Sequence, residues 1–215
     1  MLTVPILQEG GSGGRVLLLG AHPDDIEIGC GGTVLRLVER RGLEVRWVVF
    51  SSTPERAVEA RASAADFLQG VQATVTVHDH RDGYFPWAGA AIKEQFEAIK
   101  REFVPDLIFT HYRHDLHQDH RLVSELTWNT WRNHFILEYE IPKFDGDFGS
   151  PNFFSALPAA TLEHKISLVL RHFPTQAGKR WFTADLFRAV ARIRGMECAA
   201  DETFAEAFYC RKAVF

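Results

Sequence analysis

Residues 21–33 read AHPDDIEIGCGGT and follow directly on the apolar run VLLLG at residues 16–20. An imidazole and two adjacent carboxylates, those of His22, Asp24 and Asp25, therefore stand where an apolar strand is expected to end. These side chains are of the types that bind metal ions and transfer protons. Capping of a following helix does not require a histidine beside two acids, so the combination indicates a functional site.

A second loop of similar composition also leaves an apolar run. Residues 107–110 read LIFT, and residues 111–120 continue as HYRHDLHQDH, with four histidines and two aspartates. Two such loops can share one metal ion if the fold brings them together.

Apolar runs and amphipathic segments alternate from residue 15 onward. The spacing predicts strands over 16–20, 45–50, 74–78 and 107–111, and helices over 29–41, 54–68, 91–103 and 120–131. We therefore expect an α/β fold, a Rossmann-like three-layer αβα architecture whose mainly parallel sheet is covered by helices on both faces. Farther along, the pattern predicts strands over 135–139 and 153–157, helices over 161–173 and 183–194, and a closing strand over 207–215.

The order of the strands decides whether the two loops meet. In a doubly wound sheet the first four strands lie in the order 3-2-1-4, so the first and fourth are neighbours and ligands bind beyond their carboxyl ends. Residues 22–25 and 111–120 follow those two ends. We therefore predict one metal site at the C-terminal ends of the first and fourth strands.

The length of 215 residues and the hydrophobic content of 46% fit one globular domain whose core needs no disulfides. We expect residues 1–215 to form this single domain, with residues 1–14 as a flexible lead-in. The glycine-rich segment 10–14 precedes the first strand and lacks the Lys-Ser/Thr ending of a phosphate loop, so it predicts no nucleotide site.

Charge and cysteine content exclude several classes of protein. The net charge is −4 and the arginines are scattered, so nucleic acid is not an expected partner. Cys30, Cys198 and Cys210 are odd in number and form no CxxC pair, which argues against a disulfide framework and against a thiolate zinc site. No apolar run approaches the ~18 residues of a membrane span. We expect a soluble, cytoplasmic protein without a transmembrane segment.

A hydrolytic zinc ion takes three nitrogen or oxygen ligands from the protein and keeps one position for water. His22, Asp25 and His120 could supply that set, which leaves Asp24 as a base beside the water. A GxGxxG dinucleotide fingerprint would need glycine at position 34, where the chain has Val34. The residues therefore favour a metal centre over a nucleotide site.

The segments AHPDDIEIGCGGT and HDLHQDH together resemble the PIG-L/LmbE-like deacetylase superfamily, which removes acetyl groups from N-acetylglucosamine-type sugars. The order, spacing and strand context of the motifs agree from about Arg15 to Arg121. The resemblance implies a Zn²⁺ ion bound by His22, Asp25 and His120. Another divalent metal such as Fe²⁺ is compatible with the same donors.

The resemblance also implies roles for the neighbouring side chains. Asp24 would act as general base and later as general acid, and His117, oriented by Asp119, would help to stabilise the oxyanion. Arg56 resembles an active-site arginine that follows the second strand in this family. The reaction implied is metal-assisted hydrolysis of an N-acetylated amino sugar, which yields acetate and a free amine.

Three alternatives remain open from the sequence. The segment DLHQDH at residues 115–120 nearly matches the HxHxDH loop of metallo-β-lactamase-type hydrolases, whose fold is a sandwich of two sheets. Two histidines and one carboxylate also occur in iron oxygenases. A carbohydrate-binding protein without catalysis is the third. The expected partner is a small-molecule N-acetylated sugar or sugar conjugate, its identity is open, and a homo-oligomer is compatible with the resemblance.

Overall fold

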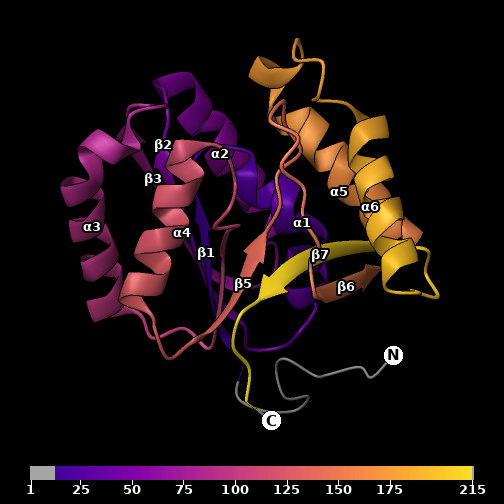
Figure 1. Cartoon of the computed structure of the whole chain (residues 1–215), viewed down its shortest axis with the longest axis horizontal. Coiled ribbons are helices and arrows are strands. Elements are labelled where there is room, and N and C mark those ends of the chain that lie inside the picture. Colours follow the sequence, from indigo (N-terminus) through magenta and orange to yellow (C-terminus); the bar gives the residue numbers. More distant parts are fainter. Residues whose placement is uncertain (1–12, 215) are drawn as a thin grey trace.

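The computed structural model describes residues 13–214, so most of the predicted lead-in lies outside the described residues. Its seven-stranded sheet has the order β3-β2-β1-β4-β5-β7-β6 (Figure 1). The strands are β1 (Arg15–Gly20), β2 (Glu44–Ser51), β3 (Gln72–His80), β4 (Leu107–His111), β5 (Phe135–Tyr139), β6 (Phe153–Leu157) and β7 (Phe204–Cys210). Strands β1 to β5 pair in parallel, whereas β7 is antiparallel to both β5 and β6. The predicted order 3-2-1-4 is confirmed.

Helices cover both faces of the sheet. They are α1 (Asp25–Leu37), α2 (Pro54–Phe67), α3 (Phe85–Glu102), α4 (Gln118–Thr130), α5 (Ala159–His172) and α6 (Ala184–Glu197), with a short 3₁₀ turn at Pro174–Gln176. One buried hydrophobic cluster joins side chains of α1, α2, α5 and α6 to the sheet, and a second joins those of α3 and α4 to it. The predicted three-layer αβα fold with a mainly parallel sheet is therefore confirmed.

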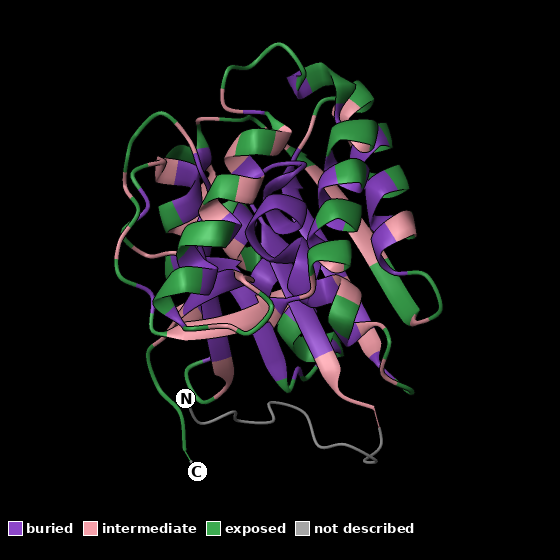
Figure 2. Ribbon diagram, turned by 90° about the vertical axis from the view of Figure 1, so that its right-hand side faces the viewer, coloured by how far each residue is buried: buried purple, intermediate pink, exposed green. Residues whose placement is uncertain are grey.

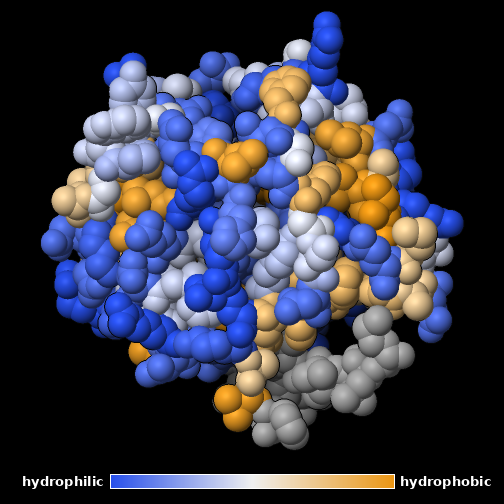
Figure 3. All heavy atoms as spheres, in the orientation of Figure 1, coloured by the Kyte–Doolittle hydropathy of each residue, from blue (hydrophilic) through white to orange (hydrophobic). Residues whose placement is uncertain are grey.

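Burial rises from the outer helices toward the middle of the molecule. The outer helices are exposed on one side, while the central strands and a central helix are buried (Figure 2). The surface seen in Figure 3 is mostly hydrophilic, with separate hydrophobic patches. No helix within residues 13–214 combines the length and the apolar character needed to cross a bilayer.

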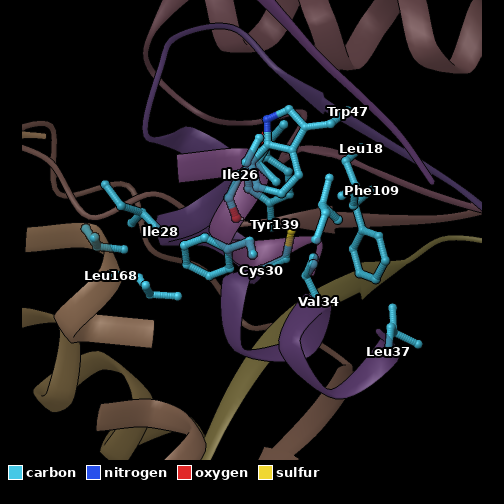
Figure 4. Packing of buried hydrophobic residues seen from close by; sticks show 14 of the residues in the cluster. Leu18, Ile26, Ile28, Cys30, Val34, Leu37, Trp47, Phe109, Tyr139 and Leu168 are labelled. Atoms are coloured by element: carbon cyan, nitrogen blue, oxygen red, sulfur yellow. Dashed lines mark hydrogen bonds between the residues drawn. The ribbon is translucent and has the colours of Figure 1, made fainter. Parts of the chain in front are cut away.

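Helix α1 is the central helix, and every residue from Asp25 to Val34 is buried. Its side chains Ile26 and Cys30 lie in the cluster that also contains Trp47 and Phe109 (Figure 4). The helix approaches the sheet so closely that a Cβ atom on Gly29 would come within 2.2 Å of Tyr139 Cδ2. Glycine is therefore required there for packing.

A buried ion pair ties α5 and β7 to the middle of α1. The Lys165 ammonium group lies 2.6 Å from Glu206 Oε1 and donates to the carbonyl oxygen of Ile28 at 2.7 Å. The Glu206 carboxylate also accepts from the backbone N–H groups of Gly32 and Thr33, at 2.8 and 2.7 Å, and from the Thr33 hydroxyl at 2.6 Å. The charges of both partners are satisfied, and α1 is attached both to the strand β7 and to the neighbouring helix α5.

Two helix starts differ from the predicted ones. Helix α1 begins at Asp25 instead of residue 29, and α3 begins at Phe85 instead of residue 91. The first turn of α1 is buried although it carries two acids, and the first turn of α3 contains Pro86, which is tolerated at that position. The spacing of apolar residues does not predict such first turns of a helix. The closing strand also differs, because β7 covers Phe204–Cys210.

Candidate metal centre

The loops after β1 and β4 converge because those strands are neighbours in the sheet. His22 and Asp25 come from the first loop and the start of α1, and His120 comes from the first turn of α4. His22 Nδ1 lies 3.1 Å from His120 Nε2 and 3.4 Å from Asp25 Oδ2. His120 Nε2 lies 3.5 Å from Asp25 Oδ1. All three side chains are buried, and they meet at one point although His22 and His120 are far apart in sequence.

These spacings are close to those around a single tetrahedral ion. Metal–ligand bonds of ~2.0–2.2 Å in tetrahedral geometry place neighbouring ligand atoms roughly 3.3–3.6 Å apart. The two distances to Asp25 lie in this range, and the distance of 3.1 Å between the histidine nitrogens is slightly shorter. The second ring nitrogen of each histidine faces a carboxylate: His120 Nδ1 lies 2.9 Å from Asp115 Oδ2, and His22 Nε2 lies 3.2 Å from Asp119 Oδ2. When these nitrogens carry the protons, the hydrogen-bond network assigns lone pairs to His22 Nδ1 and His120 Nε2. In these tautomers the two nitrogens, 3.1 Å apart, can both direct a lone pair at one cation.

Asp25 has the charge state that a metal ligand requires. The backbone N–H of His22 donates to its Oδ2 at 2.6 Å. Burial by itself would raise the pKa of this carboxyl, but the adjacent imidazoles of His120, His111 and His22 hold the pKa well below its usual value. The group is therefore anionic at neutral pH.

Asp24 lies beside these groups in a strained conformation. Its backbone has φ 100°, a left-handed geometry that aspartate adopts at a cost, and strain of this kind clusters at functional sites. Asp24 is the N-cap of α1, yet within the described structure its side chain makes no capping hydrogen bond. Burial raises the pKa of this carboxyl to about 7, although the guanidinium of Arg56, 3.3 Å away, opposes that change. The residue suits proton transfer near neutral pH better than helix capping.

Arg56 reaches the site from the first turn of α2. Its Nη2 contacts Asp24 Oδ1 at 3.3 Å and also donates to the carbonyl oxygen of Pro23. The side chain therefore stabilises the strained turn and holds a positive charge beside Asp24. Its predicted contact with substrate stays a prediction.

His117 is the N-cap of α4, and its ring Nδ1 accepts from the backbone N–H of Asp119 at 3.3 Å. Its Nε2 is left to carry the proton. Burial and the neighbouring His22 lower the pKa of His117. The carboxylate of Asp119, which we expected to orient His117, instead accepts from the backbone N–H groups of Gly83 and Phe85, at 2.6 and 3.1 Å, and faces His22. Asp119 therefore orients His117 only through its backbone.

The structure adds residues to which the sequence assigned no role in the site. Asp115, which is 2% exposed, contacts His120 and also forms an ion pair with Lys143 at 2.9 Å. His111 stacks on His120 with ring centroids 3.9 Å apart, and its Nε2 accepts from the backbone N–H of Ala21 at 2.9 Å. Asp115 and His111 therefore hold His120, one of the proposed ligands, in position.

Asp82 also reaches the centre, with its Oδ1 3.0 Å from His22 Nε2. The hydrogen bond to His22 lowers the pKa of this carboxyl to about 2. Asp82 follows β3, so its place at the same edge of the parallel sheet was the sequence signal that could have identified it. His114 is exposed and is not part of the cluster.

Three overlapping groups of candidate ligands extend the site beyond the predicted triad, and within each group the ligand atoms all lie within 4.8 Å of one another. The groups are Asp25, His111 and His120; His22, His117 and His120; and His22, Asp82, His117 and Asp119. The centre is thus a dense cluster of imidazoles and carboxylates. The described residues form a single sheet, which is not the two-sheet sandwich of the metallo-β-lactamase alternative.

Comparison with solved structures places the fold among known enzymes. The chain is similar to N,N'-diacetylchitobiose deacetylase from Pyrococcus horikoshii, with a TM-score of 0.71 and 21% identity over 91% of this chain and 83% of that one. It is equally similar to GalB, the 4-carboxy-2-hydroxymuconate hydratase of Pseudomonas putida KT2440, with a TM-score of 0.72 and 16% identity over 94% and 98% of the two chains. The fold therefore serves more than one reaction and does not by itself decide between them.

Sequence comparison favours the deacetylases over the hydratase. The chain is 27% identical over 173 residues to YaiS of Escherichia coli K12, an uncharacterized deacetylase, and the match covers 73% of this chain and 89% of YaiS. The family described as PIG-L, GlcNAc-PI de-N-acetylase, matches residues 17–131, which include both candidate metal-binding loops. Because that match covers more than half of the 215 residues, the chain belongs to the PIG-L family of deacetylases.

Proposed function

We propose that this protein is a zinc-dependent hydrolase that removes the acetyl group from an N-acetylated amino sugar or a related conjugate, with release of acetate and a free amine. The observation that carries the proposal is the pair of imidazole nitrogens, 3.1 Å apart, beside the anionic Asp25. Family membership supports deacetylation as the reaction. The fold alone does not support deacetylation over another reaction, because a hydratase shares it.

His22, Asp25 and His120 would hold the ion. Two imidazoles and one carboxylate are a common donor set for catalytic zinc, and Fe²⁺ accepts the same donors. When bound, a divalent cation polarises the substrate carbonyl and lowers the pKa of a water molecule beside it. Asp115 and Asp119, which face the outer nitrogens of the two histidines, fix the ring tautomers that this binding requires.

Asp24 is the proposed general base. Its carboxylate, adjacent in sequence to Asp25 but not needed as a ligand, takes the proton of the attacking water as the new C–O bond forms. The same group then delivers that proton to the amide nitrogen as the C–N bond breaks, so acetate and the amine leave with the protons balanced. Arg56 keeps the carboxylate in position at 3.3 Å.

His117 is the proposed donor to the oxyanion. Because its Nδ1 is occupied by the backbone N–H of Asp119, the proton of the neutral ring lies on Nε2. Its lowered pKa favours this neutral form. A neutral N–H can donate to the carbonyl oxygen as negative charge develops there, so the role does not require an imidazolium ion.

The test measures acetate release and metal content together. Zinc-loaded wild-type protein is incubated with a panel of N-acetylated sugars and their nucleotide derivatives, beside the variants Asp24→Asn, His120→Ala and His114→Ala. We expect Asp24→Asn to retain metal and lose nearly all turnover, and His120→Ala to lose the metal. The exposed His114 lies in the same loop, so His114→Ala is the matched control and should behave as wild type.

Acetate that appears in equal amount with the free amine, at the same rate without oxygen, supports hydrolysis over the iron-oxygenase alternative. A metal-loaded wild-type protein that is inert across the panel would support the non-catalytic alternative. Full activity of Asp24→Asn would remove Asp24 from the mechanism.

A further inference from the structure

Large hydrophobic side chains are exposed on the segments at the sheet edge that carries the candidate metal centre. Six of them stand on the segments that follow four successive parallel strands, β2, β3, β4 and β5, at the C-terminal edge where the centre lies. The arrowhead of β5 points to this edge, toward the top of Figure 1. The six are Val58, Tyr84, Trp87, Leu116, Phe144 and Phe148, which we call the apolar rim.

Hydrogen bonds join the segments after β3, β4 and β5 to the centre and to one another, and the helix of Val58 meets the centre through the Arg56–Asp24 ion pair. The loop before Tyr84 is held by Gly83 N–H, which donates to Asp119 at 2.6 Å. The backbone N–H of Leu116 donates to Asp147 Oδ2 at 2.7 Å, and this aspartate lies between Phe144 and Phe148 in sequence. The apolar rim is therefore continuous with the first turn of α4, which carries His120.

The composition of the apolar rim points to an aromatic ligand. Four of its six members are aromatic, and the rings of Tyr84 and Trp87 lie 5.7 Å apart. Trp87 is 77% exposed and Phe144 is 78% exposed, so each leaves a ring face open to solvent. Solvent-exposed apolar patches of this kind mark binding sites, and aromatic faces prefer aromatic partners.

The surrounding charges argue against a lipid surface. The loops of the apolar rim carry acids beside bases: Arg81 stands next to Asp82, and Lys143 is followed by Asp145 and Asp147. Binding to an anionic membrane draws on an excess of basic residues, which these loops do not have. A second copy of the chain seated on the apolar rim would cover the metal centre and shut out the substrate. A small ligand that enters the centre leaves the rim accessible.

Building on the proposed function, we propose that the substrate carries an aromatic group beside its N-acetylated sugar and that the apolar rim binds this group while the acetamide reaches the metal centre. The substrate class is thus an aromatic glycoside of an N-acetylated amino sugar. Free sugars and sugar nucleotides would leave the rim uncovered.

Calorimetric titration tests the proposal without relying on turnover. The full-length, zinc-loaded Asp24→Asn protein is titrated with methyl and phenyl N-acetyl-β-D-glucosaminide, and with phenyl β-D-glucopyranoside, which has no acetamide. We expect the phenyl group to tighten binding about tenfold, which is the effect of one well-placed apolar contact. The gain should fall severalfold when Trp87→Ala or Phe144→Ala is added.

Val104→Ala is the matched control, because Val104 is also exposed but precedes β4 at the opposite edge of the sheet. It should keep the full preference for the phenyl glycosides. Equal affinity for methyl and phenyl glycosides, absence of binding by either, or a preference that survives both rim substitutions would overturn the proposal.

The proposal and the proposed function fail in different ways. Acetate release by wild type with equal kcat/KM for the methyl and phenyl glycosides would refute the aromatic subsite and leave the deacetylase intact. Tight, rim-dependent binding of both phenyl compounds with no acetate release would refute the deacetylase activity and leave the aromatic subsite intact. Loss of dimers or of vesicle binding in the rim variants would assign the surface to another occupant and overturn the proposal.

Discussion

Removal of one partner from the buried Lys165–Glu206 pair should destabilise the protein more than any exposed ion pair does. Glu206 accepts four hydrogen bonds of 2.6–2.8 Å, one from Lys165 and three from the backbone and hydroxyl groups of α1. In Glu206→Gln an amide NH₂ group faces some of those donors, and Lys165 becomes a buried charge without a counter-ion. In Lys165→Met the carboxylate loses its cation and the Ile28 carbonyl loses a donor.

The burial of the pair sets the magnitude. Breaking a buried ion pair from one side costs roughly 3–5 kcal/mol, out of a total stability of roughly 5–15 kcal/mol for a typical domain. For a chain of this size 1 kcal/mol shifts Tm by roughly 2–4 °C, so each single variant should melt about 6–20 °C below wild type. The double variant Lys165→Met/Glu206→Gln leaves no buried charge and should lose less than the sum of the singles, by about 0.5–3 kcal/mol.

Urea denaturation followed by circular dichroism measures these free energies of unfolding. Glu163→Gln is the matched control, since Glu163 lies on the same helix and pairs with Arg188 at 2.7 Å, but in an exposed position. Its stability should stay close to that of wild type. Single variants within about 1 kcal/mol of wild type, or strictly additive effects in the double variant, would refute the reasoning.

Three further predictions concern the site and the helix that carries it. His117→Ala should retain zinc, measured by metal analysis, and lose at least about tenfold in kcat, since one oxyanion donor is worth around 10²–10³ in related hydrolysis; unchanged kcat would exclude the role. Gly29→Ala places a Cβ atom 2.2 Å from Tyr139 Cδ2 and should cost about 1–3 kcal/mol of unfolding free energy, whereas Gly178→Ala, whose Cβ meets nothing within 4 Å, should be near neutral. Burial raises the pKa of Glu27 to about 8, above the unfolded value of roughly 4.3, so its stabilising contribution is complete below about pH 4 and is lost as the pH rises toward 8. Glu27→Gln should therefore gain stability relative to wild type between pH 5 and pH 8 in urea titrations of the metal-free proteins, and a constant difference would contradict this pKa.

The outline of the centre was readable from the sequence because it depends on topology. Alternating strands and helices predict a doubly wound sheet, and that sheet brings the segments after its first and fourth strands to one edge. His22, Asp25 and His120 could therefore be placed together although His22 and His120 are 98 positions apart in the sequence. Their grouping in the structure, within 3.5 Å, follows from the pairing of β1 with β4.

The partners that complete the centre depend on side-chain directions, which no periodicity encodes. Asp119 faces His22 rather than His117. Asp115 points inward to His120, although the sequence alone is equally compatible with an exposed loop position. Asp82 enters from a third loop. Each outcome is set by how the loops fold over the sheet edge and by which donors they meet there.

The sequence by itself determined the order of the first four strands, the edge that carries the chemistry and the types of residue that meet there, because these follow from local periodicity and from the topology of a doubly wound sheet. Only the tertiary structure decided which nitrogens of His22 and His120 face carboxylates, that Asp24 is held with φ 100°, and that Trp87 and Phe144 are exposed. These properties arise from contacts between segments distant in the chain, since burial and hydrogen-bond partners exist only once the layers have packed.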